Sequence, residues 1–235
     1  MLDALTPSLL RAHPRAGKRS GDAERRILVV DDDPAPWAGL ICILLRCGVS
    51  ADISPRIPES LLSGRPATPI CLILDLRPGR DGLRFQQRLA AAGVFVPIIF
   101  VAEASDTALT VKAMKNGAID FFGKPFRDSD LSEAVEIGLA RDQAWCDEQR
   151  SLSLLRSRFE TLSLRERQVM AGVVQGKLNK QVAFDLSISE ITVKAHRGKV
   201  MRKMNAMSLP ELARMADRLA HACPWRDDAY RALAA

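Results

Sequence analysis

The sequence has no long hydrophobic run, which argues against membrane-spanning helices. The longest apolar stretch, residues 40 to 49, is interrupted by Arg46 and is much shorter than the roughly 18 residues that a span requires. The first 26 residues also lack the sustained apolar segment of a secretory signal. We therefore expect a protein that has no membrane partner and stays in the cytoplasm.

Cysteine is scarce and is not arranged for bridging or for binding zinc. The five cysteines are scattered, odd in number, and form no CxxC pair. This pattern argues against a disulfide framework and against a structural zinc site. We expect the cysteines to pack as small hydrophobic side chains.

The length and the charge distribution indicate two domains with different roles. A chain of 235 residues with 47% hydrophobic and 26% charged residues is typical of a globular protein with two domains. Residues 161 to 221 carry eleven Lys and Arg against five Asp and Glu, so the whole formal excess of +6 lies there. Such a segment attracts a polyanion such as nucleic acid, although a solvated basic face would have the same composition.

The N-terminal part shows strands that alternate with helices. Residues 1 to 24 have no sustained period and are expected to form a flexible leader. Four strands are expected, at residues 27 to 30, 70 to 74, 96 to 101 and 119 to 122. Helices are expected at residues 39 to 47, 82 to 92, 107 to 116 and 130 to 144, and prolines blur a further unit at 51 to 62. This alternation predicts βαβ units around a doubly wound parallel sheet, an α/β domain at residues 25 to 144.

Charged side chains follow the expected strands where each one ends. Asp31, Asp32 and Asp33 follow the first strand, Asp75 follows residues 70 to 74, and Lys124 lies just past the closing strand. The carboxyl ends of parallel strands meet at one edge of a sheet, where ligands bind. Converging carboxylates suit Mg²⁺, and the pattern indicates an aspartyl-phosphate site. Alternatively, the three consecutive aspartates form an ordinary turn that caps a helix.

These residues resemble the receiver domain of two-component response regulators. The resemblance covers about residues 26 to 144 and rests on three segments, ILVVDDD, LILDLR and NGAIDFFGKPF. It implies a (βα)5 flavodoxin-like fold and phosphorylation of Asp75 by a sensor histidine kinase. It also implies that Mg²⁺ is held by Asp32, Asp75 and the backbone carbonyl of Arg77, with Asp31 assisting.

The resemblance assigns further roles near the closing strand. Lys124 would contact the phosphoryl group, the Lys124-Pro125 peptide is a candidate cis bond, and Phe121 stands at the position of an aromatic switch residue. Two features depart from the family pattern. Ala102 replaces the Thr or Ser whose hydroxyl binds the phosphoryl oxygen, and the stretch DLRPGRDG after Asp75 is one residue shorter than usual.

Two alternatives to a phosphorylation-controlled regulator are open, the first suggested by these departures and the second by the strand-end carboxylates with Mg²⁺. In the first, the receiver is a protein-interaction module that works without phosphorylation. In the second, the chain is an aspartyl-phosphate hydrolase. Haloacid-type hydrolases need a second acid two residues after the nucleophile, and Arg77 occupies that position. We therefore expect a regulator and not an enzyme.

The C-terminal part shows only helical patterns. Residues 145 to 160 are charged, prone to form a helix and without an apolar core stripe, and are interpreted as a linker. Ser163 and Glu166 are spaced as a capping box for a helix that ends before Gly176. Asn179 is expected to cap a helix at 180 to 186, Ser189 a helix that ends near Met204, and Ser208 a fourth. Two short helices joined by Ser187-Ile188 indicate a helix-turn-helix.

The third helix of this domain has an apolar side and a basic side. Val193, Val200 and Met204 lie on the side expected to face the core. The residues at the middle of the basic side are small, which allows the helix to approach a major groove closely. His196 has no metal or catalytic partner nearby and is expected to be structural. The DNA-binding candidates are Lys180, Thr192, Lys194, Ala195, Arg197, Gly198, Lys199 and Arg202, where Arg197 and Lys199 suit packing as well as phosphate contact.

The run from LSLRERQV to KVMRKM resembles the LuxR-type helix-turn-helix, and with the receiver the order is similar to FixJ or NarL regulators. This implies an all-α four-helix domain at residues 161 to 221, followed by a tail at 222 to 235, that binds duplex promoter DNA. Regulators of this type commonly bind DNA as homodimers, and RNA polymerase is a further candidate partner. Candidates for a subunit contact are Leu209, Leu212, Met215 and Leu219, whose alternative role is packing in their own core.

Overall fold

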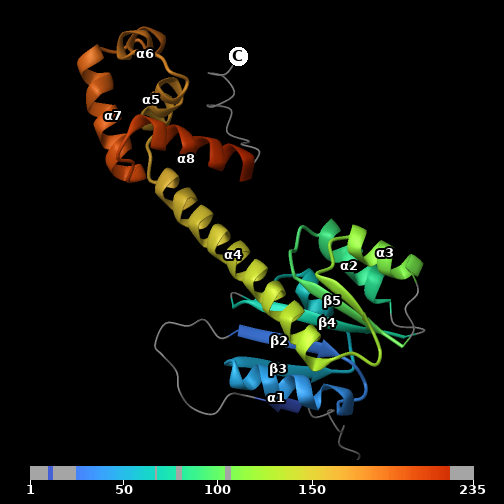
Figure 1. Ribbon diagram of the computed structural model, residues 1–235. Coiled ribbons are helices and arrows are strands. Elements are labelled where there is room, and N and C mark those ends of the chain that lie inside the picture. The colour runs from blue at the N-terminus through green and yellow to red at the C-terminus, as the bar shows by residue number, and fades with distance from the viewer. Residues whose placement is uncertain (1–9, 13–24, 67, 78–80, 104–106, 223–235) are drawn as a thin grey trace, which may run out of the picture. The chain divides into compact units, whose positions relative to one another are not determined.

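The computed structural model describes residues 10–12, 25–66, 68–77, 81–103 and 107–222. The chain divides between Cys146 and Asp147 into two compact units. The first unit is built on a sheet, and the second consists of helices (Figure 1).

A six-stranded sheet forms the centre of the first unit. Its strands are β1 (Leu10–Ala12), β2 (Arg25–Val30), β3 (Val49–Ser54), β4 (Ile70–Leu76), β5 (Ile98–Ala102) and β6 (Asp120–Gly123). They lie in the order β1-β3-β2-β4-β5-β6, and all neighbours are parallel except β1, which pairs antiparallel with β3. The five parallel strands have the flavodoxin-like order, whose reversal point lies between β2 and β4. The predicted doubly wound sheet is confirmed.

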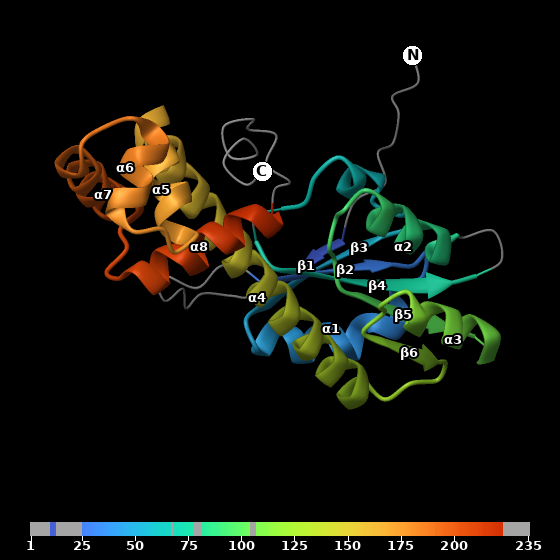
Figure 2. The same ribbon diagram turned by 90° about the horizontal axis from the view of Figure 1, so that it is seen from above.

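Helices cover both faces of this sheet (Figures 1 and 2). The first unit contains α1 (Ala38–Arg46), α2 (Gly82–Ala91), α3 (Thr107–Lys115), the start of α4 (Asp128–Glu160) and the 3-10 turns η1 (Ala35–Trp37) and η2 (Glu59–Leu62). Buried residues of α1 and α4, such as Leu40 and Leu131, form one core layer with the strands. Residues of α2 and α3, such as Phe85 and Ala113, form the other. The sheet is thus buried on both faces, and its carboxyl-terminal edge is left for a site.

Two predictions for the N-terminal part need correction. Leu10–Ala12 lies in the expected flexible leader but forms β1, because its backbone pairs with the edge of β3. The blurred unit at residues 51 to 62 contains only β3 and η2. Pro55 and Pro58 lie between these elements, and a proline lacks the N–H that would continue a strand or a helix. Residues 1–9, 13–24 and the end of the expected tail, 223–235, lie outside the described residues.

Helix α4 continues through the expected linker. The sequence predicted a helix at residues 130 to 144, whereas α4 runs without a break to Glu160. The expectation that residues 145 to 160 lack an apolar stripe is wrong. Leu152, Leu155 and Phe159 are buried, and the last two belong to the core of the second unit. Their spacings of three and four residues place them on one face of the helix.

Four shorter helices complete the second unit. They are α5 (Leu164–Val174), α6 (Asn179–Leu186), α7 (Glu190–Met204) and α8 (Leu209–Ala222). The predicted capping box is present, because the Glu166 N–H donates to Ser163 Oγ at 3.3 Å and the Ser163 N–H donates to Glu166 Oε2 at 2.8 Å. Ser189 Oγ accepts from the Thr192 N–H at 3.1 Å. No helix among the described residues combines the length and the apolar character that a membrane crossing needs.

Two details of this unit differ from the expectation. Leu178, not Asn179, is the residue that precedes the first turn of α6, and its N–H donates to Gln181 Oε1 at 2.8 Å. On α8, two of the four candidates for a subunit contact take their alternative role. Leu212 and Leu219 are fully buried in the unit's own core, so packing there, the alternative role, describes them correctly. The half-buried Leu209 and Met215 pack against the same core.

Candidate functional site

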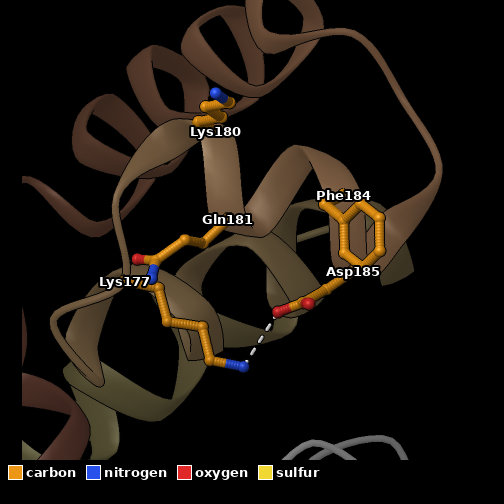
Figure 3. A pocket seen from close by; sticks show the side chains of 5 residues that line it. All are labelled: Lys177, Lys180, Gln181, Phe184 and Asp185. Atoms are coloured by element: carbon orange, nitrogen blue, oxygen red, sulfur yellow. Dashed lines mark hydrogen bonds and ion pairs between the residues drawn. The ribbon is translucent and has the colours of Figure 1, made fainter.

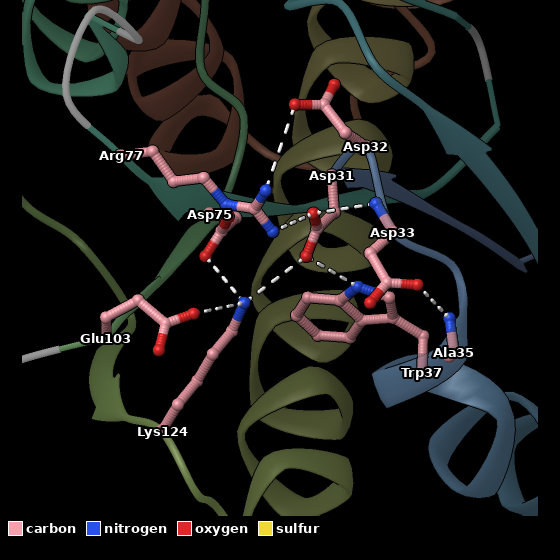
Figure 4. A network of polar contacts seen from close by, with 9 residues as sticks. All are labelled: Asp31, Asp32, Asp33, Ala35, Trp37, Asp75, Arg77, Glu103 and Lys124. Atoms are coloured by element: carbon pink, nitrogen blue, oxygen red, sulfur yellow. Dashed lines mark hydrogen bonds and ion pairs between the residues drawn. The ribbon is translucent and has the colours of Figure 1, made fainter.

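Buried carboxylates meet at the carboxyl-terminal edge of the sheet (Figure 4). Asp31 directly follows β2, and Asp75 is the next-to-last residue of β4, the strand that pairs with β2. Both side chains are fully buried. Because β2 and β4 flank the reversal point of the strand order, this edge is where a ligand is expected in such a sheet.

Lys124 brings a positive charge from the end of β6 to the same place. Its Nζ lies 2.9 Å from Asp75 Oδ1 and 3.4 Å from Asp31 Oδ2. A third carboxylate, the exposed Glu103, lies 3.7 Å away. Burial lowers the pKa of Lys124, but the bonds and charges of Asp75 and Asp31 outweigh burial and raise it above the ordinary value. The ammonium group is therefore held charged beside both aspartates.

The guanidinium of Arg77 is a second cation at this site. Its Nη2 lies 2.5 Å from Asp31 Oδ1, its Nε forms an ion pair with Asp75 Oδ2, and its Nη1 lies 3.9 Å from Asp32 Oδ2. Burial lowers the pKa of Arg77, but the charges of Asp75 and Asp31 raise it further than burial lowers it. The sequence assigned only the backbone carbonyl of Arg77 to this site, so the role of the side chain was missed.

Donors surround both carboxylate oxygens of Asp31. Oδ1 accepts from the Asp33 N–H at 3.1 Å as well as from Arg77. Oδ2 accepts from Trp37 Nε1 at 2.9 Å, in addition to the contact with Lys124. Burial raises the pKa of Asp31, whereas these hydrogen bonds and charges lower it more, so the net shift is downward. Trp37 is fully buried, and its sequence position six residues after Asp31 carried no signal of this contact.

The carboxylate oxygens of this site are of the type that binds Mg²⁺, but in this structure they form ion pairs with Arg77 and Lys124. Asp75 and the more exposed Asp32 offer the carboxylates that Mg²⁺ prefers. Within the described ranges, however, no three His, Cys, Asp or Glu side chains are placed to hold a metal ion. The Arg77 guanidinium contacts Asp31, Asp32 and Asp75.

The expected switch residues lie around Lys124. Ala102 is the buried last residue of β5, and its carbonyl accepts from the Lys124 N–H at 2.8 Å. Phe121 is half-buried in β6, with its ring centroid 6.5 Å from that of Phe100. The Lys124-Pro125 peptide is cis, as predicted. The shortened loop after Asp75 includes residues 78–80, which lie outside the described residues.

The basic face of α7 is exposed as the periodicity predicted. Val193, Val200 and Met204 are buried on the opposite side. Gly198 has open space where a side chain would be, so the middle of the face is unobstructed. Lys194 Nζ lies 3.9 Å from Glu190 Oε1, an exposed pair. The exposed candidates on this helix are Lys194, Ala195, Gly198, Lys199 and Arg202.

Three residues at the border of this face are half-buried. Thr192 Oγ1 lies 2.7 Å from Ser189 Oγ at the start of α7. Arg197 Nη1 donates to Asn179 Oδ1 at 3.3 Å and so joins α7 to α6. His196 is half-buried, and among the described residues its Nδ1 has no hydrogen-bond partner. Arg197 thus has a packing contact, which the sequence left open beside phosphate contact.

Lys180 lies at an open hollow along α6 (Figure 3). The hollow is lined by Lys177, Lys180, Gln181, Phe184 and Asp185. Lys177 Nζ and Asp185 Oδ2 form an ion pair at 2.9 Å, and Figure 3 shows Lys180 apart from it. Phe184 is 86% exposed. The Lys180 side chain is exposed near the amino end of α6, where a phosphate is attracted by the helix dipole.

Two family models match the chain, one over each unit. "Response regulator receiver domain" matches residues 27–136, and "Bacterial regulatory proteins, luxR family" matches residues 160–216. The first match contains the carboxylate site, and the second contains α5, α6 and α7.

Several known proteins are similar to this chain over most of its length. Nodulation protein W of Bradyrhizobium diazoefficiens is 42% identical over 206 residues, which cover 87% of this chain and 91% of that protein. The transcriptional regulatory protein FixJ of Azorhizobium caulinodans is 40% identical over 189 residues, covering 80% and 90%. Among solved structures, the response regulator StyR is 35% identical with a TM-score of 0.71, covering 83% of this chain and all of that one.

Proposed function

The chain belongs to the FixJ-type response regulators, and we propose that phosphorylation of Asp75 controls its binding to promoter DNA. The membership makes it a DNA-binding transcriptional regulator with a receiver domain. The observation that carries the proposal is the position of Asp75, a buried carboxylate at the ligand-binding edge of the sheet, 2.9 Å from the ammonium of Lys124.

We infer that Asp75 is the phosphoryl acceptor of a sensor histidine kinase. An Asp75 oxygen attacks the phosphorus of a phosphohistidine, the phosphorus–nitrogen bond breaks, and its electron pair returns to the imidazole. Lys124 then pairs with the new phosphoryl oxygens, since its Nζ already lies between Asp75 and Asp31. Mg²⁺ held by Asp32, Asp75 and the carbonyl of Arg77 would supply further positive charge for those oxygens.

The experiment compares the wild type with Asp75→Asn, each incubated with Mg²⁺ and acetyl phosphate. We expect only the wild type to acquire a phosphoryl group, to dimerise more strongly and to bind its promoter more tightly. Sedimentation and DNA-binding titrations measure the last two. Equal dimerisation and equal affinity of the two proteins with and without acetyl phosphate would rule out phosphorylation control.

A second candidate function is supported by Ala102. At the end of β5, its methyl group cannot donate the hydrogen bond that a hydroxyl would give to a phosphoryl oxygen. The receiver would then act as a protein-interaction module, and the DNA-binding unit would work without phosphorylation. In that case Asp75→Asn leaves promoter binding unchanged, while loss of the whole receiver alters it.

We propose that α7 enters the major groove with its exposed basic face. Lys194 would reach base edges or a phosphate, Arg202 a phosphate, and Lys180 a backbone phosphate beside α6. The double variant Lys194→Ala/Arg202→Ala should weaken duplex binding and flatten its salt dependence. Arg214→Ala, an exposed change on α8, is the matched control and should leave both unchanged. Unchanged affinity of the double variant would mean that another face binds DNA.

The remaining partners follow from the same proposal. A homodimer would place two copies of α7 on paired half-sites of a promoter. RNA polymerase is a candidate partner at such a promoter. The protein needs access both to promoter DNA and to the sensor histidine kinase. We therefore propose that it acts in the cytoplasm.

A further inference from the structure

We propose that the Arg77 side chain is a built-in cation of the carboxylate cluster and that Mg²⁺ has to displace it. The inference rests on the proposed function only in placing the Mg²⁺ site at Asp75. It concerns a side chain, whereas the metal ligand implied for this position is the backbone carbonyl. Its consequence is that the metal affinity of the site is set by competition within the protein.

The Arg77 guanidinium contacts the three carboxylates that the resemblance assigns to the Mg²⁺ site. The guanidinium pairs with Asp31 and Asp75, and its third nitrogen faces Asp32. Each oxygen of Asp31 already has two donors, so this carboxylate has little remaining capacity for a metal ion. Asp75 is approached from one side by Arg77 and from the other by Lys124. Arg77 therefore competes with a metal ion for the oxygens of Asp75 and Asp31.

Arg77 can leave because its side chain is not enclosed. About a third of it, 32%, is exposed, whereas the side chains of Asp31 and Asp75 are fully buried. A long side chain at the rim can rotate into solvent without any change in the sheet. Only molecules whose Arg77 side chain has turned into solvent can then bind Mg²⁺. The apparent affinity for Mg²⁺ equals the intrinsic affinity multiplied by the fraction of such molecules.

The test measures Mg²⁺ binding to the full-length chain by calorimetry, with the fluorescence of the tryptophans as a second signal. Trp37 is a suitable reporter because its Nε1 donates to Asp31. We expect Arg77→Ala and Arg77→Gln to bind Mg²⁺ about tenfold or more tightly than the wild type, since charge-assisted bonds to the competitor are lost. Arg84→Ala removes an exposed arginine of α2 and should match the wild type.

The outcomes separate this inference from the proposed function. Equal Mg²⁺ affinities of the wild type and both Arg77 variants would overturn the competition, and so would an Arg77 variant that is folded by circular dichroism but binds no Mg²⁺. Acetyl phosphate labelling of Asp75 is measured in parallel. If Asp75 is labelled but the Arg77 variants have unchanged metal affinity, only the inference about Arg77 is contradicted. If no protein is labelled but Arg77→Ala binds Mg²⁺ more tightly, only the proposed phosphorylation is contradicted.

Discussion

The guanidinium of Arg65 binds both carboxylate oxygens of Asp142, with Nη1 2.7 Å from Oδ1 and Nη2 2.5 Å from Oδ2. Asp142 lies fully buried in α4 and also accepts from the N–H of Ile70, the first residue of β4, at 2.8 Å. The ring of Trp145 lies 4.4 Å from the guanidinium. Asp142 therefore joins α4 to the start of β4 through the Ile70 N–H and to the segment before that strand through Arg65.

Removal of this buried carboxylate should destabilise the first unit strongly. Asp142→Ala leaves the Arg65 guanidinium without its carboxylate partner and the Ile70 N–H without its acceptor, so we expect a loss of about 3–5 kcal/mol, typical of a broken buried pair. Urea unfolding followed by tryptophan fluorescence measures it. The control is Asp147→Ala, whose pair with Arg150 is exposed and should contribute less than about 1 kcal/mol. Similar losses in both variants would contradict this role of the Arg65–Asp142 pair.

Glu166 should make the stability of the second unit depend on pH in the acid range. Its buried carboxylate accepts from Lys203 Nζ at 2.6 Å and from the Ser163 N–H at 2.8 Å. Burial raises the pKa of Glu166, but these bonds lower it more, so its folded pKa lies below the ordinary 4.5. The ionised form therefore stabilises the fold above the unfolded pKa, and this contribution disappears as the pH falls through the folded pKa.

Glu166→Gln tests this dependence. We expect the variant to be less stable than the wild type by roughly 1 kcal/mol at neutral pH, because a neutral amide replaces the charged acceptor that pairs with Lys203. The difference should shrink as the pH is lowered below 4.5. Thermal unfolding over a pH series measures it, with the exposed Glu190→Gln as control. A difference that stays constant down to acid pH would show that packing, not charge, is lost.

The sequence could predict the site's location because strand order follows from simple rules. Asp31 and Asp75 each lie at the end of a buried apolar run, and parallel strands bring such ends to one edge. It could not predict which side chains fill the space between them. Arg77 and Trp37 reach Asp31 through side-chain rotamers and the path of η1, and neither leaves a periodic trace in the sequence.

Helix α4 shows a different limit. Leu152, Leu155 and Phe159 have helical spacing, so a signal was present, but the many charged residues around them concealed it. The start of α6 was misplaced for a third reason. Asn179 is a favoured capping residue, yet its side chain is used by Arg197 of another helix. Long-range contacts of this kind override local preference.

Arg197 should act on DNA binding by positioning α7 and not by touching phosphate. Its guanidinium is half-buried and donates to Asn179, so Arg197→Ala and Asn179→Ala should each lower stability by about 1 kcal/mol. Both variants should weaken promoter binding with an unchanged salt slope. The exposed Lys199→Ala should instead reduce the slope by about one. If Arg197→Ala reduces the slope and Asn179→Ala does not, then Arg197 contacts a phosphate.

The fold does not require glycine at position 198, so substitutions there can test DNA binding separately from stability. Apart from its chain neighbours and the nearby backbone of its own helix, a Cβ at this position would meet no atom within 4 Å. Glycine within a helix costs about 0.5–1 kcal/mol relative to alanine, so Gly198→Ala should raise stability by that amount. At Gly172 in α5, by contrast, a Cβ would lie 2.9 Å from Val182 Cγ2, and Gly172→Ala should destabilise the core.

If the basic face of α7 enters the groove, bulk at Gly198 should block binding without harming the fold. Gly198→Leu adds a side chain at the centre of the face, where the helix and the bases approach most closely. We expect the folded variant to lose at least about tenfold in promoter affinity, equal to roughly 1.4 kcal/mol. The salt slope should change little, because no basic residue is removed. A Gly198→Leu protein with wild-type affinity would show that this face stays outside the groove, whatever the lysines around it contribute.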